Sequence, residues 1–547
     1  AIWLSPITVS PDADYGYDVA DYCNVQPAFG DLGDVDRLIR EAAERGIRVI
    51  LDIVPNHSSD RHPWFTDARS GRGARHRDWY VWADPKADGG YPNNWVSAFG
   101  GPAWTRDEHT GQYYLHNFLA QQPDFNWWNS EVADAFDEIY RFWFDRGVAG
   151  FRIDVAHGIV KDRELRDNPL ATKDDPPDVR ALGQRMVYNI DRPEVHDVLR
   201  HWRTLADRYQ PPRILLGETY VIDVRTMGRF YGIGDELNLA FNFTFVHAPL
   251  QAAALAEVVA ETELIIPKVG WPVWTVSNHD VSRVMSRWCE GDERKLRTAL
   301  LSLLTLRGTP VLYYGDEIGM PDTPIRKAEL RDPMGKRHWP APRGRDPERT
   351  PMQWHNETGG GFTNAALEPW LPIGDTARNV EDQQADPGSI LSFVRDLIAL
   401  RRTSPDLQAG QYRQLTSPGD TWAWQRGDAT VVAVNLSGRR LFVPDLAGRV
   451  LISTTRSRDG EQLADGLRHR PRHQFAKSAR PRRRRRNRRP RRGILLDVGP
   501  AARMVGVRPA GLVAGGRHRR EAGRRRSRRR DRGHRTFGPD AWCRPQR

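Results

Sequence analysis

Short apolar runs alternate with stretches of helical periodicity over most of the chain. Seven runs have the length and apolar character of buried strands: 1–7, 47–54, 148–155, 213–218, 237–245, 273–277 and 310–315. Between them, apolar residues recur every three or four positions and predict amphipathic helices, at 32–43, 132–144, 195–209 and 296–306. A repeated order of strand and helix predicts a parallel sheet covered by helices, with a pocket at the carboxyl ends of its strands.

Beyond these strands and helices, the chain has an irregular region and a C-terminal region. Residues 58–122 are rich in Trp, Gly, Pro, His and Asp without a clear period, which predicts a lobe inserted over the pocket. Residues 387–402 fit a last barrel helix, and 422–424 with 430–434 predict antiparallel hairpins. We therefore expect an α/β fold with these units: a (β/α)8 TIM barrel in two parts (1–57 and 123–403), a lobe after the third barrel strand (58–122), and a small C-terminal β-sandwich-like domain (404–467).

The positive charge of the chain lies at its C-terminal end. Residues 468–547 hold 28 Arg and one Lys against four acidic residues, a net charge of +25, so residues 1–467 carry −13 of the total of +12. This segment lacks apolar periodicity, and no aromatic residue interleaves its Arg runs to stack on bases. An RNA- or membrane-binding arm is one interpretation and a tail without a selected role is the other. We favour the second, and expect a disordered tail and no nucleic-acid partner.

Other features restrict the class of protein. No stretch approaches the roughly 20 apolar residues of a membrane helix. The three cysteines, Cys23, Cys289 and Cys543, lack the spacing of metal ligands. We expect a cytoplasmic protein without a membrane partner, and composition does not fix its oligomeric state.

Carboxylates end or follow three of the predicted strands. Asp154 ends 148–155, Glu218 ends 213–218 and Asp280 follows 273–277, so a barrel would bring all three to one face. Cleavage of a glycosidic bond needs such a group, because one acid must be protonated while another is ionised. Arg152 lies two residues before Asp154 on the same strand face, and its charge should lower the pKa of Asp154. A plain ion pair is the alternative for this Arg-x-Asp pattern, and a helix cap is the alternative for Glu218.

Several segments together carry a family resemblance. They are DIVPNH at 52–57, QPDFN at 122–126, GFRID at 150–154, GE at 217–218, SNHD at 277–280, YGDEIG at 314–319 and RTPMQW at 349–354. In this order they resemble the α-amylase superfamily, glycoside hydrolase family 13, and within it the exo-acting α-glucosidase and oligo-1,6-glucosidase branch. The resemblance covers residues 1–467, and 150–161 is most similar to actinobacterial α-glucosidases.

The resemblance implies a role for each carboxylate. Asp154 corresponds to the nucleophile that forms a covalent glycosyl-enzyme, and Glu218 to the general acid/base. Asp280 corresponds to the third carboxylate, which holds sugar hydroxyls.

It also implies a set of residues around the terminal glucose, formed by Asp14, Tyr17, His57, Arg152, His279 and Arg345. Among them, Arg345 would close the pocket beyond the first sugar, with Arg349 as the competing choice. The two histidines could instead be structural, and Tyr17 could be a core residue.

The resemblance finally implies a retaining exo-α-glucosidase that acts on terminal α-1,4 and/or α-1,6 bonds of short malto- or isomalto-oligosaccharides without a cofactor. In this family, a valine directly after the nucleophile, here Val155, goes with a preference for α-1,6 links. A transglycosylase or a maltose-trehalose isomerase similar to trehalose synthase would use the same carboxylates, whereas a non-catalytic transporter-associated ectodomain would lack them. The calcium- or magnesium-binding loop and the first barrel strand of the family would precede Ala1, so we expect no metal ligands and a barrel short of one strand.

Overall fold

The computed structural model describes residues 1–463 and 493–496, apart from 176, 222, 268–269, 342–343, 365–366, 440 and 442–445. All seven predicted barrel strands form: β1 (Ile2–Leu4), β4 (Val49–Ile53), β8 (Gly150–Ile153), β9 (Ile214–Gly217), β10 (Leu239–Ala240), β11 (Val273–Thr275) and β12 (Thr309–Val311). They pair in parallel in the order β1-β4-β8-β9-β10 and β11-β12. A parallel bridge between Phe241 and Val273 joins the two groups.

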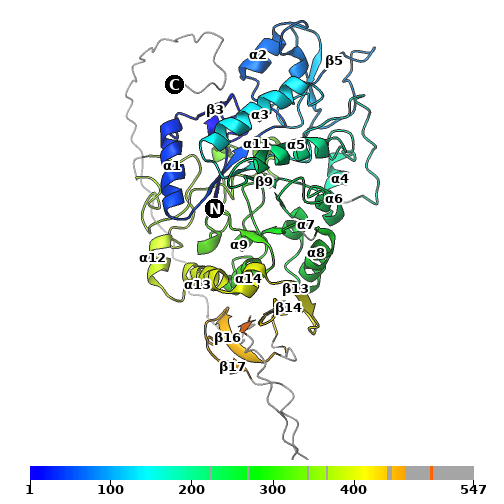
Figure 1. Ribbon diagram of the computed structural model, residues 1–547. Coiled ribbons are helices and arrows are strands. Elements are labelled where there is room, and N and C mark those ends of the chain that lie inside the picture. Colours follow the sequence, from blue (N-terminus) through cyan, green and yellow to red (C-terminus); the bar gives the residue numbers. More distant parts are fainter. Residues whose placement is uncertain are drawn as a thin grey trace, which may run out of the picture.

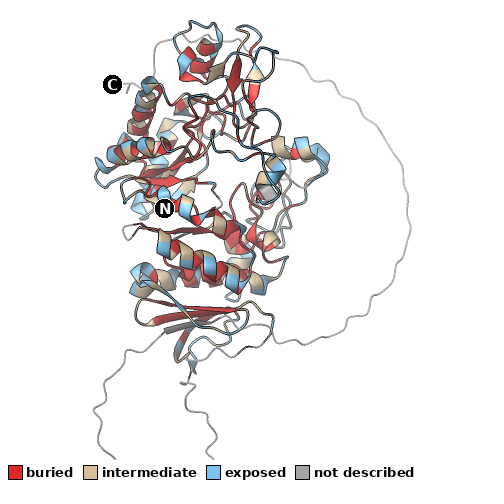
Figure 2. Cartoon of the chain, turned by 90° about the vertical axis from the view of Figure 1, so that its right-hand side faces the viewer, coloured by how far each residue is buried: buried red, intermediate tan, exposed pale blue. Residues whose placement is uncertain are grey.

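Helices cover the outside of these strands (Figure 1). They are α1 (Leu32–Glu44), α3 (Ser130–Asp145), α5 (Val195–Asp207), α8 (Ala252–Ile265), α10 (Glu293–Thr305) and α13 (Ile390–Thr403). The start of α1 is set by a capping box, in which the side chains of Asp31 and Asp34 accept from each other's main-chain N–H groups. Buried residues are concentrated in the strands and on the helix faces turned toward them (Figure 2). Parallel strands inside and helices outside are the layers of a (β/α)8 TIM barrel, of which the described residues provide seven strands.

One predicted strand is half helix. The apolar run 237–245 forms only the two-residue strand β10, and its second half is the helix α7 (Phe243–His247). The reason is Asn242, whose side chain accepts a hydrogen bond from the N–H of Phe245 and so caps a helix. Apolar character alone does not distinguish a buried strand from a buried helical turn.

Residues 58–122, between β4 and α3, have their own secondary structure and core. They contain α2 (Pro63–Arg69), the short helix η1 (Arg77–Trp79) and an antiparallel sheet of β5 (Trp82–Ala83), β7 (Tyr113–Leu115) and β6 (Trp104–Arg106), in that order. Trp95 and Trp104 stack 6.2 Å apart in the centre of this small core. The absence of sequence periodicity therefore reflects very short elements.

The C-terminal part is one six-stranded sheet in the order β13-β14-β15-β18-β16-β17. Its strands are β13 (Tyr412–Leu415), β14 (Thr421–Arg426), β15 (Thr430–Asn435), β16 (Gly448–Ser453), β17 (Gln462–Leu463) and β18 (Gly493–Leu496). The predicted hairpin is β14 with β15, and Trp422 and Trp424 pack into the core formed with α8 and α10. A second, facing sheet, which a sandwich needs, is not among the described strands.

Within the predicted tail 468–547, residues 493–496 form β18, which pairs in parallel with both β15 and β16. The remainder of that segment lies outside the described residues, and the prediction of a disordered tail with it. In the part of the chain that is described, no helix has both the length and the apolar character needed to cross a membrane.

Candidate active site

The sheet register places the first charged residues of the site side by side. Asp52 on β4 is paired with Arg152 on β8, so their side chains leave the sheet on the same face. Asp154 follows β8 directly and Glu218 follows β9. All four residues are therefore delivered to the carboxyl end of the barrel by neighbouring parallel strands, as the sequence predicts.

Arg152 is the centre of this group, which we call the Arg152 cluster: Arg152, Asp52, Asp154 and Glu218. Its Nη1 lies 2.9 Å from Asp52 Oδ1 and 2.6 Å from Asp154 Oδ1, and its Nη2 lies 2.9 Å from Glu218 Oε2. The Arg152 side chain is only 2% exposed. One buried guanidinium therefore contacts three carboxylates. The cluster has a net negative charge when all four groups are ionised.

This imbalance decides the protonation of the cluster. Burial raises the pKa of Asp52 to about 6, against the attraction of Arg152. Burial also raises the pKa of Asp154; Arg152 lowers it, but Glu218 and Asp52 raise it further, and the net shift is well upward. The spacing of Arg152 and Asp154 predicted a lowered pKa for Asp154. The predicted direction is wrong, because burial, the largest cause, and the two other carboxylates at the same guanidinium together outweigh Arg152.

Glu218 is held by the main chain as well as by Arg152. Its Oε2 accepts a hydrogen bond from the N–H of Val155 at 2.9 Å, and its carbonyl oxygen accepts one from the N–H of Ala156 at 3.0 Å. Val155 has a φ of +46°, which is rare for a β-branched residue. This unusual turn after Asp154 directs the Val155 N–H toward the Glu218 carboxylate.

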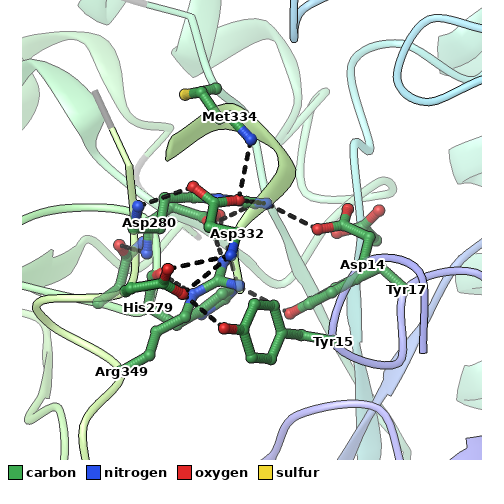
Figure 3. Close-up of polar contacts among 12 residues, drawn as sticks. Asp14, Tyr15, Tyr17, His279, Asp280, Asp332, Met334 and Arg349 are labelled. Atoms are coloured by element: carbon green, nitrogen blue, oxygen red, sulfur yellow. Dashed lines mark hydrogen bonds and ion pairs between the residues drawn. The ribbon is translucent and has the colours of Figure 1, made fainter. Parts of the chain in front are cut away.

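A second group, the Asp280 cluster, consists of Asp280, Arg345, Arg349, Asp14 and Asp332. Figure 3 labels all of these except Arg345. Asp280 Oδ1 accepts from Arg345 Nη1 at 3.1 Å and from Arg349 Nη2 at 2.7 Å. Here two guanidiniums meet the one carboxylate of Asp280.

Burial alone would raise the pKa of Asp280, but His279 and the two arginines outweigh it and hold the pKa well below its usual range. His279 is itself neutral near pH 7, because burial lowers its pKa to about 3. We therefore attribute the shift of Asp280 to Arg345 and Arg349.

The sequence left open whether Arg345 or Arg349 closes the pocket beyond the first sugar. The two arginines have different contacts. Arg345 Nη2 lies 2.6 Å from Asp14 Oδ1, so this side chain spans Asp14 and Asp280. Asp332 fixes it through a hydrogen bond of 2.8 Å to the same Nη2. Arg349 contacts Asp280 and the carbonyl oxygen of His279. Arg345 is therefore the arginine that meets Asp14.

Tyr17 connects the two clusters. Its hydroxyl donates to Asp52 Oδ2 at 2.9 Å and lies 2.8 Å from His279 Nε2, and its ring stacks on that of His279. His57 lies on the other side of Tyr17, with its Nε2 3.1 Å from the Tyr17 carbonyl oxygen. Burial lowers the pKa of His57 to about 3, so it too is neutral near pH 7. The structure thus brings all nine predicted site residues together.

Three site residues were missing from the predicted set. Asp52 opens the 52–57 segment and Gln122 opens the 122–126 segment, so both stood in quoted motifs without a role. Asp52 contacts Arg152, and Gln122 Nε2 lies 3.1 Å from both Asp14 Oδ2 and His57 Nε2. Asp332 was not predicted, because it caps the short helix α11 (Pro333–His338) and does not stand at the end of a barrel strand.

Metal ligation has no candidate in the described part of the chain, where no group of three or more His, Cys, Asp or Glu side chains is placed to hold an ion.

The comparisons with known proteins agree with this geometry. The family described as "Alpha amylase, catalytic domain" matches residues 1–410. The "Probable alpha-glucosidase" of Rhizobium meliloti (strain 1021) is 41% identical over 441 residues, which cover 78% of this chain and 79% of the relative. The "Oligo-1,6-glucosidase" of Heyndrickxia coagulans is 34% identical over 455 residues, covering 76% and 80%.

Solved structures are similar over the same region. The α-glucosyl transfer enzyme XgtA has a TM-score of 0.78 at 38% identity and covers 82% of this chain and 86% of its own. The trehalulose synthase MutB from Pseudomonas mesoacidophila MX-45 has a TM-score of 0.71 at 31% identity, with coverages of 80% and 83%. The family match spans more than half of the chain, and the predicted resemblance is confirmed: the chain belongs to the alpha-amylase family of glycoside hydrolases.

Proposed function

We propose that the chain is a retaining exo-α-glucosidase that hydrolyses terminal α-1,4 and/or α-1,6 glucosidic bonds of short malto- or isomalto-oligosaccharides. The observation that carries this proposal is the contact of one buried guanidinium, Arg152, with both Asp154 and Glu218. Two carboxylates held by one cation lie close enough to act on one anomeric carbon from two sides. Burial and the surplus of negative charge favour one proton held within the cluster, and the reaction requires that proton on Glu218 with Asp154 ionised.

The hydrogen bonds suggest which oxygen atoms react in the first step. Asp154 Oδ1 is engaged by Arg152, which leaves Oδ2 to attack the anomeric carbon. Glu218 Oε2 receives the Val155 N–H and the Arg152 Nη2, so Oε1 is the oxygen that can carry the proton. The bond from the anomeric carbon to the glycosidic oxygen breaks, that oxygen takes the proton from Glu218, and a glucosyl ester forms on Asp154.

The second step reverses these roles. Glu218, now ionised, removes a proton from a water molecule whose oxygen bonds to the anomeric carbon. Asp154 leaves as a carboxylate, and Glu218 regains the proton that it gave away. Two inversions retain the α configuration.

The exo action rests on the Asp280 cluster. Arg345 is paired with Asp14 at 2.6 Å and with Asp280, and this bridge would close the pocket beyond one glucose. Asp280, His57 and His279 would bind the hydroxyls of that glucose. Because Asp280 has a lowered pKa, it stays an acceptor at any pH at which the enzyme is expected to work.

The proposal is tested with maltose, isomaltose, sucrose and trehalose, by following products with proton NMR from the first minutes. We expect the first glucose released to be the α-anomer. Initial release of the β-anomer would contradict the retaining mechanism. Asp154→Asn protein provides the control for contaminating activity.

Glucosyl transfer is the second candidate, either as transglycosylation or as isomerisation of maltose to trehalose. It is favoured by the similarity to an α-glucosyl transfer enzyme and to a trehalulose synthase. The same time course distinguishes the two: hydrolysis gives glucose from the start, whereas transfer gives new disaccharides or trisaccharides before glucose accumulates.

A further inference from the structure

We infer that a cavity between the lobe and the barrel is a second carbohydrate-binding site, separate from the catalytic pocket. The cavity has a volume of 390 Å³ and lies where three segments meet: 78–82 of the lobe, 126–129 before α3, and 161–165 beyond β8. This volume is at the small end of the range of ligand sites. The inference goes beyond the proposed function and rests on it only for the choice of an α-glucan as ligand.

One wall of the cavity offers an aromatic platform. Trp128 is 40% exposed, although its indole N–H is already satisfied by the carbonyl oxygen of Lys161 at 2.9 Å. This hydrogen bond fixes the ring while leaving part of its surface open. Trp82, on the lobe side, stacks on Phe65 with ring centroids 5.7 Å apart and has the guanidinium of Arg77 3.4 Å from its ring centre, so its faces are occupied. The platform is therefore the exposed part of Trp128, which matches the C–H face of a pyranose.

Polar groups without partners accompany these rings. The side chains of Asp78 and Arg163 are exposed and form no ion pair in the described part of the chain. The guanidinium of Arg163 lies 5.6 Å from the centre of the Trp128 ring. The indole nitrogen of Trp82 is buried and has no hydrogen-bond partner there either. Planar carboxylate and guanidinium groups can each bind two neighbouring hydroxyls, which is the pattern that a sugar presents.

The rim of the cavity is rigid. Asn126 and Asn129 both donate their side-chain amides to the carbonyl oxygen of Asp78, at 2.9 Å and 3.3 Å. Asn129 also caps α3 by accepting from the N–H of Glu131. The lobe and the barrel are thus tied together at the cavity, so its shape does not depend on a ligand.

The charges favour a neutral ligand over an anion. Lys161 lines the cavity, but its ammonium group lies 2.5 Å from Asn56 Oδ1 and 3.0 Å from Asp124 Oδ2 and is therefore already neutralised. The carboxylate of Asp162 is likewise paired, with Arg166 and Arg192, so the lining charges without an ion pair in the described part of the chain are those of Asp78 and Arg163, one of each sign. A neutral polyhydroxyl compound fits this mixture of aromatic and polar groups better than a phosphorylated one.

The cavity is distinct from the catalytic pocket. Asp154, Glu218, Asp280 and Arg345 do not line it. A chain of hydrogen bonds from Lys161 to Asn56 to His57 lies between the two places, with Asn56 Nδ2 3.0 Å from His57 Nδ1. A sugar in the cavity would therefore occupy neither the terminal-glucose position nor the reacting bond.

The test uses the full chain with its catalytic pocket filled by saturating 1-deoxynojirimycin, an iminosugar that mimics glucose. Maltotriose is then titrated by calorimetry. We expect one remaining binding site, which Trp128→Ala weakens about tenfold or more and Trp128→Phe largely preserves. Maltotriose 6-phosphate esters should bind less well than maltotriose.

Controls separate this inference from the proposed function. Hydrolysis of p-nitrophenyl α-glucoside reports on the catalytic pocket, and Trp128→Ala should leave its kcat/KM unchanged, which also shows that the variant is folded. No heat from maltotriose in the filled enzyme would overturn the second site, as would binding that Trp128→Ala does not change. If the unmodified chain did not hydrolyse p-nitrophenyl α-glucoside, the proposed function would be overturned instead of the second site.

Discussion

The two halves of the site use the same residue types in different proportions. In the Arg152 cluster, one guanidinium meets three carboxylates, whereas the Asp280 cluster has two guanidiniums for its three carboxylates and both of them meet Asp280. Burial raises the pKa of Asp52 and Asp154 in the first cluster and acts in the same direction on Asp280 in the second. The pKa of Asp154 ends well above its usual value and that of Asp280 well below it, so the number of nearby cations decides the direction.

This difference matches two chemical tasks. A general acid/base that gives a proton to the leaving oxygen and regains one from water needs a site in which one proton is easily held and easily lost. A carboxylate that only binds hydroxyls works best when it remains ionised and fixed. Tyr17, which contacts Asp52 and His279, lies between the two environments and stays neutral because burial raises its pKa well above 10.

The largest expected effect comes from removing the nucleophile of the Arg152 cluster. Asp154→Asn should lower kcat by several orders of magnitude while sugar binding persists, because an amide cannot form the glucosyl ester. Rates with p-nitrophenyl α-glucoside and binding of 1-deoxynojirimycin measure the two properties separately. Near-normal turnover would remove Asp154 from its proposed role.

Replacing an arginine of the Asp280 cluster by a neutral residue should lower activity less than loss of the nucleophile. It should also change the pH dependence of kcat/KM. Arg345→Gln should lower kcat/KM about 100-fold, because it breaks a buried charge pair with Asp14 and with Asp280. The pKa of Asp280 should rise when one cation is lost. As the pH falls, Asp280 would then be protonated earlier, so the acid limb of the kcat/KM profile should move to higher pH.

Arg349→Gln is the matched control, since Arg349 contacts Asp280 and does not contact Asp14. It should move the acid limb in the same direction, but it should keep the preference for terminal glucose that we assign to Arg345. An unchanged acid limb in both variants would show that the arginines do not set the ionisation of Asp280.

A buried group outside both clusters, His62, tests the contribution of burial where no carboxylate is among the causes of the pKa shift. Burial lowers the pKa of His62 to about 3, from an ordinary value of 6.5. Between these values the unfolded chain binds more protons than the folded one, so the free energy of unfolding falls as the pH is lowered from about 6.5 toward 3. From pH 7 to pH 5 this single residue should cost about 2 kcal/mol.

His62→Asn should remove this pH dependence while keeping the helix start, because His62 caps α2 by accepting from the N–H of Trp64 and Asn is a good cap. Chemical unfolding at pH 7 and pH 5 gives the comparison. Equal losses of stability in the variant and the unmodified chain would mean that His62 titrates normally.

Much of the fold followed from the sequence because each barrel strand is a short apolar run between amphipathic helices. The prediction was wrong at 237–245, where the cap formed by Asn242 ends the strand early. In the site, the residues that stand in motifs at strand ends were predicted from the sequence, since the parallel sheet by itself brings the strand ends together. Asp332 was not, because its contact with Arg345 depends on the path of a loop. The direction of the pKa shift of Asp154 could not be predicted, because it depends on the positions of Asp52 and Glu218, which the spacing in the sequence does not give.

The smallest expected effect concerns linkage preference and the turn after the nucleophile. The family resemblance places the Val155 side chain near the leaving sugar, but the contact of this residue with Glu218 is made by its main-chain N–H. Val155→Thr keeps the branched shape and that N–H, so turnover should persist while the ratio of kcat/KM for isomaltose over maltose falls by no more than about tenfold. Val155→Ala, which removes the branch, should shift the ratio in the same direction. If both variants lost activity toward both disaccharides, the side chain itself would be needed to hold the turn at φ +46°, and the position of Glu218 would depend on packing as well as on the main chain.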